Sequence, residues 1–268
     1  MGGVDISEVV QRQVRDGVAL LTLNRPDRLN AWTAEMERVY FAMLEECGQA
    51  EEVRVIVVTG AGRGFCAGAD MHDLQALGDR KVDVDVEAAL ERRPQTFPHS
   101  IPKPIIAAIN GACAGIGLVQ ALMCDMRFAA DGAKLTTAFA RRGLVAEHGI
   151  SWILPRLVGP ARALDLLLSG RVVLAQEAQA LGLLNRVSAP EQLLEETLDY
   201  ARELASKCSP ASMATMKRQV YADLDRALPD ALAGADRLML ESFTAPDFVE
   251  GVTSFLQHRD PRFAPLGA

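Results

Sequence analysis

Two glycine-rich stretches could do chemistry with backbone amides. Residues 64–70 and 110–117 each follow an apolar run that is typical of a buried strand, and the second opens a helical pattern. Glycine permits a left-handed backbone and close approach, and a helix N-terminus exposes free N–H groups. If the two turns face each other, two amides can bind one developing oxyanion, as acyl chemistry on a thioester or ester requires. The alternative is that both stretches are tight connections whose glycines serve packing alone.

The side chains carry few of the signatures that catalytic sites usually show. Neither the four histidines nor the five cysteines follow a metal-ligand spacing, so we predict no metal site. The cysteines are widely spaced without a C-x-x-C pair, which is typical of a reduced intracellular protein. Residues 60–64 do not follow the G-x-G-x-x-G pattern of a dinucleotide-binding fold. Cys66 and Cys113 lie in the glycine stretches, and we interpret them as small buried thiols.

The charge balance of the chain bears on its partners. Its 268 residues contain 28 lysines and arginines against 35 aspartates and glutamates, a formal net charge of −7. Such an acidic protein is not expected to bind nucleic acid or an anionic membrane. If its ligand is an anion, the attraction must come from a local basic cluster or from backbone amides. The reduced cysteines and a start without a basic, apolar leader predict a cytoplasmic protein.

One uncharged stretch, residues 104–124, has the hydropathy and the G-x-x-x-G pattern of a membrane-spanning helix of about 20 residues. Asn110 and the glycines after it split the stretch into two halves, each too short to span a bilayer. The first half, 105–109, is β-prone, and the second, 118–124, is helix-prone. We therefore expect a buried strand, a glycine turn and a buried helix.

Apolar periodicity predicts the elements that position the two turns. Strand and helix patterns alternate in the first half of the chain, which predicts an α/β fold with a largely buried sheet. We expect strands at 18–23, 53–59, 105–109 and 126–129, and helices at 33–46, 70–77 and 118–124. Residues 78–100 follow no clear period, so we expect a mobile insertion or a helix flanked by loops. Helices are predicted later at 161–169, 175–181, 191–206, 211–224, 229–243 and 247–256, with a weak strand at 185–187.

Four motifs together resemble the enoyl-CoA hydratase/isomerase (crotonase) superfamily. They are N-R-P-D-R-L-N-A at 24–31, F-C-A-G-A-D at 65–70, A-A-I-N-G-A-C-A-G-I-G at 107–117 and C-D-M-R-F-A at 124–129. The resemblance covers nearly the whole chain. It implies a spiral of β-β-α units at 1–205, a helical C-terminal oligomerisation region at 206–268, and a homotrimer or homohexamer. It also implies an acyl-CoA thioester as substrate and no cofactor beyond the CoA moiety.

The resemblance also assigns residues to the site. It places an oxyanion hole at the backbone N–H groups of Ala69 and Ile116, where the family commonly has glycine at the second position. The residues that it places along the CoA site are Arg25, Arg28, Leu29, Ala31, Ala67, Asp70, Met71 and His72. Arg28 is the candidate for a phosphate contact, and the alternative is a solvated loop arginine. Asp70 is more typical of a helix cap than of a proton carrier.

The catalytic carboxylates of the family's hydratases are missing from this sequence. Those enzymes use two glutamates, and the corresponding positions here are Val119 and Phe139, which cannot transfer protons. Glu147 lies in G-L-V-A-E-H-G, which resembles the G-L-x-x-E-x-G stretch of some Δ3,Δ2-enoyl-CoA isomerases. One carboxylate suffices for a 1,3-proton shift, because the same base can remove a proton from C2 and return it at C4.

Glu147 has a simpler interpretation as a loop acid paired with Arg141 or Arg142. We favour catalysis, with His148 as a weaker candidate for a second proton carrier. The leading hypothesis is therefore isomerisation of 3-enoyl-CoA to 2-enoyl-CoA. A 2-enoyl-CoA hydratase is the first alternative, and a lyase or hydrolase of the same superfamily is the next. A CoA-thioester binding protein without catalysis is the alternative from a different class.

Overall fold

The main sheet lies at the centre of the protein. The structure, a computed structural model, describes residues 5–6, 9–79 and 93–267, so most of the segment 78–100 lies outside it. Within the described residues, seven strands form this sheet in the order β1 (Asp5–Ile6), β2 (Val10–Arg15), β3 (Val18–Leu23), β4 (Val55–Gly60), β6 (Ile105–Ile109), β8 (Met126–Ala130) and β11 (Arg186–Ser188). The strands from β3 to β11 are parallel, whereas β1 and β2 form an antiparallel edge.

A smaller sheet lies at the carboxyl ends of the parallel strands. Its described strands follow the order β10 (Val173–Leu174), β9 (Lys134–Thr136), β7 (Ala112–Ala114) and β5 (Gly64–Cys66). The chain places β4, β6 and β8 in the main sheet and the next strand of each pair, β5, β7 and β9, in the smaller one. A helix follows each pair, namely α2 (Met71–Asp79), α4 (Ile116–Leu122) and α5 (Ile150–Val158). This repetition is the predicted spiral of β-β-α units, which is confirmed.

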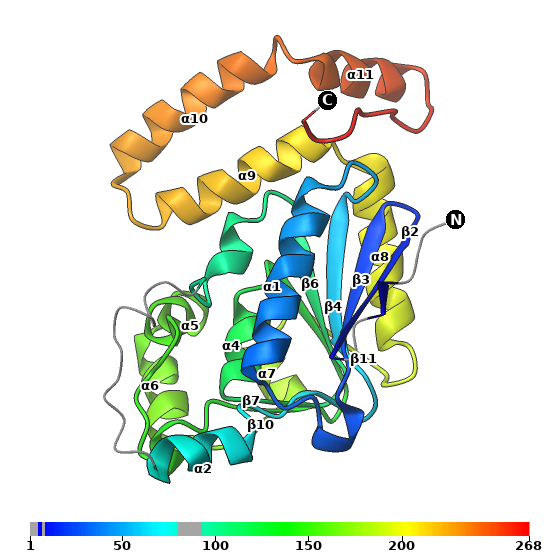
Figure 1. Cartoon of the computed structure of the whole chain (residues 1–268). Coiled ribbons are helices and arrows are strands. Elements are labelled where there is room, and N and C mark those ends of the chain that lie inside the picture. The colour runs from blue at the N-terminus through cyan, green and yellow to red at the C-terminus, as the bar shows by residue number, and fades with distance from the viewer. Residues whose placement is uncertain (1–4, 7–8, 80–92, 268) are drawn as a thin grey trace.

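The main sheet is buried on both faces because its strands alternate apolar residues toward two cores. In β4, Ile56 and Val58 face one core, whereas Val55 and Val57 face the other. Helix α1 (Ala34–Gln49) covers the first face and α8 (Leu193–Lys207) the second (Figure 1). Helices α6 (Pro160–Ser169) and α7 (Ala175–Leu181) extend the first core. The expected cap of α1 is present, since Thr33 Oγ1 accepts a hydrogen bond of 3.2 Å from the Met36 amide.

Three C-terminal helices lie beyond the amino ends of the parallel strands (Figure 1). They are α9 (Pro210–Asp223), α10 (Leu228–Ser242) and α11 (Pro246–Leu256). Many of their apolar side chains are exposed, with Leu228 at 79% and Phe255 at 78%. The division between 1–205 and 206–268 stays a prediction, and α8, which packs on the main sheet, ends at Lys207.

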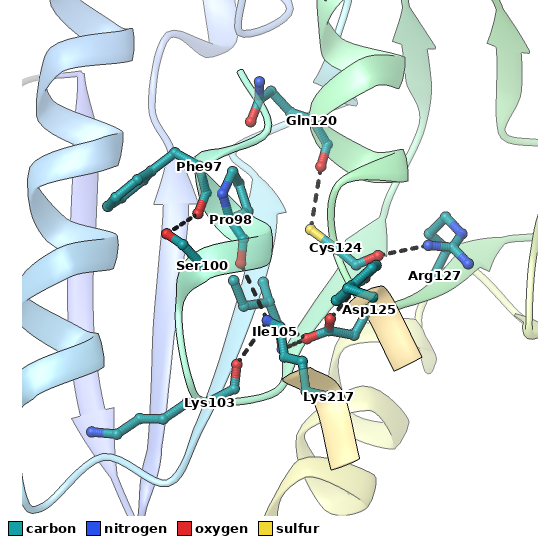
Figure 2. A network of polar contacts seen from close by, with 11 residues as sticks. Phe97, Pro98, Ser100, Lys103, Ile105, Gln120, Cys124, Asp125, Arg127 and Lys217 are labelled. Atoms are coloured by element: carbon teal, nitrogen blue, oxygen red, sulfur yellow. Dashed lines mark hydrogen bonds and ion pairs between the residues drawn. The ribbon is translucent and has the colours of Figure 1, made fainter. Parts of the chain in front are cut away.

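A largely buried ion pair attaches α9 to the core. Lys217 Nζ lies 2.8 Å from a carboxylate oxygen of Asp125, and it also donates to the carbonyl oxygens of Pro98 and Lys103. Figure 2 shows that Asp125 simultaneously accepts a hydrogen bond from the Ile105 amide, at 2.7 Å, where β6 begins. We call this cluster, with Tyr221 and His99, the α9 network.

The uncharged stretch at 104–124 forms β6, β7 and α4, which confirms the expected strand, glycine turn and helix. Every residue of β6 and α4 is buried in the protein interior. Among the residues that the structure describes, no helix has the length and apolar character needed to cross a bilayer.

Candidate functional site

The two glycine-rich stretches lie side by side. Strands β5 and β7 pair in parallel, with Gly64 opposite Ala112 and Cys66 opposite Cys113. Glycine is required for this proximity: a Cβ atom at Gly117, in the first turn of α4, would lie 2.3 Å from the carbonyl oxygen of Cys66. No real Cβ contact is that short, so the first turn of α4 can pack on the first stretch only without a side chain.

The amide of Ala69 points away from its neighbouring strand. The Trp32 amide donates to the Gly68 carbonyl at 2.8 Å, and the Asp70 amide donates to the Trp32 carbonyl at 3.0 Å. Successive backbone groups of an extended chain point to opposite sides, so the Ala69 N–H is directed away from Trp32. Ile116 is the first residue of α4, and its N–H therefore has no acceptor within the helix.

Both residues line one cavity of about 560 Å³. Of the predicted site residues, the cavity is also lined by Arg28, Ala31, Ala67, Asp70, Met71, His72 and Glu147. Arg25 and Leu29 are not among its described lining residues. The structure thus brings the candidate oxyanion amides, the candidate base and most of the candidate CoA contacts together around one space.

Arg25 supports the cavity wall from behind. Its guanidinium donates to Asp70 Oδ2 at 2.9 Å and to the Ala31 carbonyl at 2.6 Å. Asp70 uses its other oxygen to accept from the His72 amide at 3.1 Å, which is the helix cap expected at the start of α2. The hydrogen bond with Arg25 is the main reason that the pKa of Asp70 is lowered. Both oxygens of Asp70 are therefore occupied by the protein itself.

The loop at 24–31 is held by a residue to which no role was assigned from the sequence. Asn30 is fully buried, and its Nδ2 donates to the carbonyl oxygens of Ala61 and Gly64 at 2.9 and 2.8 Å. Leu29 and Asn30 both have a positive φ, of 48° and 57°. Asparagine tolerates this conformation better than most residues, so an asparagine in a turn motif was the available signal.

Glu147 stands in a loop in which Gly143, His148 and Gly149 have a positive φ. Its carboxylate lies 3.3 Å from Nε2 of His148, and its side chain is 30% exposed. The arginines proposed as alternative partners are occupied elsewhere: Arg141 donates to the Ser169 carbonyl at 2.9 Å and Arg142 to the Ala138 carbonyl at 3.2 Å. Within the described residues, no ion pair joins either arginine to Glu147.

The two positions at which hydratases of the family carry glutamates hold buried apolar side chains in the structure. Val119 is fully buried in the core, and Phe139 lines the cavity with only 5% of its surface exposed. Phe139 belongs to the connection between β9 and α5, which also contributes Thr137, Ala138, Arg142 and Leu144 to the cavity. Thr137 and Ala138 are the residues of this wall that no signal in the sequence marked.

The two cysteines beside the site are not activated nucleophiles. Burial raises the pKa of the Cys66 thiol to about 12, and it raises that of Cys113 well above its usual value. A nucleophilic cysteine reacts as a thiolate, which burial in apolar surroundings disfavours. Both residues therefore contribute packing beneath the turns.

Comparisons with known proteins agree with this geometry. Residues 13–265 match the family model described as enoyl-CoA hydratase/isomerase. The 1,2-epoxyphenylacetyl-CoA isomerase of Escherichia coli K12 is 34% identical over 264 residues, covering 96% of this chain and 98% of the relative. The structure of an enoyl-CoA hydratase from Mycobacterium marinum is 51% identical with a TM-score of 0.70, covering 82% of this chain and 100% of that one. An enoyl-CoA hydratase from Polaromonas sp. JS666 has a TM-score of 0.87 at 30% identity, covering 95% and 99%.

Proposed function

Because this chain belongs to the enoyl-CoA hydratase/isomerase family, whose members act on acyl-CoA thioesters, we propose that it isomerises 3-enoyl-CoA to 2-enoyl-CoA. The supporting observation is the number of available carboxylates. Two acidic residues, Asp70 and Glu147, are among the described residues that line the cavity. Asp70 is bound by Arg25 and by the His72 amide, which leaves Glu147 as the carboxylate able to take a proton.

The proposed reaction needs one base and two amide donors. The Glu147 carboxylate removes a proton from C2, so that the C2–H bond breaks and an O–H bond forms on Glu147. The electron pair of the broken bond is delocalised over C2 to C4 and the thioester oxygen. The amides of Ala69 and Ile116 stabilise the enolate oxygen. Glu147 then returns the proton at C4, which leaves the double bond between C2 and C3, conjugated with the carbonyl. The reaction requires no cofactor beyond the CoA moiety.

The CoA moiety would lie along the residues of the first glycine stretch and of α2. Arg28 lines the cavity, and none of the described carboxylates is paired with it. A free guanidinium binds phosphate well, and it would supply the local positive charge that an acidic protein needs for an anionic ligand.

Hydration of 2-enoyl-CoA is the second candidate. The name of the Mycobacterium marinum protein favours it, and the name of the E. coli relative favours an isomerase. Hydration by the family's two-glutamate route has no support here, because Val119 and Phe139 occupy the two positions. A protein that binds CoA thioesters without catalysis is the remaining alternative.

One assay separates these candidates. Purified protein is incubated with 3-enoyl-CoA or with 2-enoyl-CoA, and the absorbance of the conjugated thioester is followed. We expect a rise with the first substrate, and a fall with the second would favour the hydratase. Glu147→Gln should lower the isomerase rate by about 100- to 10,000-fold, the usual effect of removing a general base. Glu35→Gln, at an exposed acid of α1 outside the cavity lining, is the control and should leave the rate unchanged.

We also propose that the protein assembles as a homotrimer or homohexamer through the C-terminal helices. Exposed apolar patches mark interaction surfaces. These helices expose large apolar side chains, which include Leu228, Leu232, Leu240, Phe255 and Leu256. Light scattering during gel filtration should give a multiple of three chains, and a monomer would contradict this. We expect a cytoplasmic protein, because all five cysteines are free.

A further inference from the structure

The contact between Glu147 and His148 requires an unusual backbone. Neighbouring residues in a strand point to opposite faces, and neighbours in a helix diverge by roughly 100°, so their side chains do not normally meet. Here Nε2 of His148 lies 3.3 Å from Oε2 of Glu147, and both residues line the cavity. The backbone that permits this has a φ of 59° at His148, followed by 81° at Gly149.

A positive φ is costly at a residue with a Cβ atom, and such conformations occur often where function needs them. The His148 side chain has no other hydrogen bond or ion pair within the described residues. Its position is therefore not explained by an attachment to the core. The contact that the strained backbone produces is the one with Glu147.

We propose that His148 is a positioning residue for Glu147, which rests on the proposed function of Glu147 as the base. The imidazole Nε2 acts as the donor toward Oε2 and holds the carboxylate in one orientation, which leaves Oε1 to take the C2 proton. The two atoms lie 3.3 Å apart, and catalytic hydrogen bonds that are long or poorly aligned commonly tighten when substrate binds. His148 keeps its own proton throughout, so the proton moves only between the substrate carbon atoms and Glu147.

Arg28 and Arg142 line the same cavity, as does His72 on α2, whereas Asp70 is paired with Arg25. Among the described lining residues, Glu147 is therefore the carboxylate left for His148 to contact.

The test compares three variants in the absorbance assay with 3-enoyl-CoA. His148→Phe keeps the ring but removes the donor, and its kcat should fall about 10- to 100-fold, the worth of a hydrogen bond to a charged group. KM should change less than about twofold, because substrate binding does not use this contact. His148→Gln restores a donor at this position, so it should recover most of kcat. His258→Phe is the control, since His258 also has a positive φ, of 53°, and lies outside the cavity lining.

The outcomes distinguish the two proposals. If Glu147→Gln is inactive while His148→Phe keeps its kcat within twofold, the positioning role is wrong and the proposed base stands. If wild-type protein is inactive or Glu147→Gln is fully active, the proposed function and the positioning role both fail. A second measurement does not depend on activity: the ¹⁵N shift of Nε2 of His148 should change in Glu147→Gln, and an unchanged shift would overturn the proposal even if His148→Phe failed to fold.

Discussion

The two ends of strand β6 use polar groups differently. At its amino end, the Ile105 amide and Lys217 both bind the Asp125 carboxylate, which also accepts from the Tyr221 hydroxyl at 3.0 Å. At its carboxyl end, β6 leads into the second glycine stretch, where Ala69 and Ile116 line the cavity. The first end satisfies a charge with other protein groups, and in the proposed function the second leaves amide donors for a ligand.

This difference separates stability from activity along one strand. An unpaired charge in the interior is costly, so removing one partner from the network at the amino end should lower the stability of the fold. Donors that face a cavity contribute to catalysis because they are arranged before the substrate arrives. In parallel sheets ligands generally bind at the carboxyl ends of the strands. Substitutions at the two ends should therefore change different measured quantities.

The largest expected effect on stability is at the amino end. Lys217→Met removes one partner of an ion pair whose side chains are only 7% and 16% exposed, and it leaves Asp125 buried without its cation. The free energy of unfolding should fall by about 3–5 kcal/mol, while kcat of the folded fraction changes little. Urea denaturation measures the first quantity and the isomerase assay the second.

Lys207→Met is the matched control for that substitution. Lys207 pairs with Glu203 at 3.6 Å, and both side chains are more than half exposed. Exposed pairs contribute roughly 0–1 kcal/mol, so this variant should unfold nearly as the wild type does. If the free energy of unfolding falls equally in the two lysine variants, burial of the Asp125–Lys217 pair does not increase its contribution to stability.

The longer strands and helices could be predicted from the sequence, because each is marked by an apolar run or an apolar periodicity within its own residues. The strands at 18–23 and 105–109 match the structure, and so do the later helices 175–181 and, with small shifts at their ends, 211–224. The short strands β5, β7 and β9 have only three residues each, and the patterns of β5 and β7 lie within the glycine-rich stretches. Helix α5 was missed because it contains Pro155 and begins after Gly149 without a side-chain cap.

The site was predicted less completely than the fold, because lining a cavity depends on side-chain direction. Arg25 and Arg28 lie three residues apart in one motif, yet Arg25 turns back to Asp70 whereas Arg28 lines the cavity. Periodicity cannot separate them, because the loop between them is irregular. The α9 network was not predicted at all: it joins Asp125 to a lysine 92 positions away, on a helix whose apolar spacing gave no indication of that contact.

At the carboxyl end, the packing of α4 on the first glycine stretch depends on Gly117. Gly117→Ala places a Cβ atom 2.3 Å from the Cys66 carbonyl, so the first turn of α4 must move away from the first glycine stretch. The Ile116 amide then loses its alignment with that of Ala69, and kcat should fall by about 100- to 1,000-fold, as when an oxyanion-hole donor is removed. Steady-state kinetics measure this, and thermal unfolding reports the accompanying loss of stability.

Gly64→Ala serves as the comparison within the same pair of turns. Its Cβ atom would lie 3.5 Å from the nearest side-chain atoms of Leu29, an ordinary contact distance, and its φ is not left-handed. This variant should keep kcat within a few fold of wild type. If both alanine variants lose activity equally, the close approach of Gly117 to Cys66 is not what aligns the two amides.

The smallest expected effect is a pH dependence of stability that arises from His99 at the amino end of β6. His99 stacks on Tyr221 with ring centroids 4.1 Å apart, and burial lowers the pKa of His99 to about 4. At pH values between the ordinary histidine pKa of about 6.5 and this lowered pKa, His99 is protonated in the unfolded chain and unprotonated in the folded protein. Stability is therefore lost as pH falls through this window, by about 1–2 kcal/mol between pH 7 and pH 5.

His99→Phe retains a stacking ring and cannot titrate, so unfolding of this variant should depend less on pH than that of the wild type between pH 7 and pH 5. Because His99 belongs to the amino end of β6, the pH profile of kcat should be the same in both proteins. His148→Phe should behave in the opposite way, with a lowered kcat and an unchanged pH dependence of unfolding. Should His99→Phe alter the activity profile instead, the amino end would be coupled to the cavity, and the separation of stability from activity along β6 would not hold.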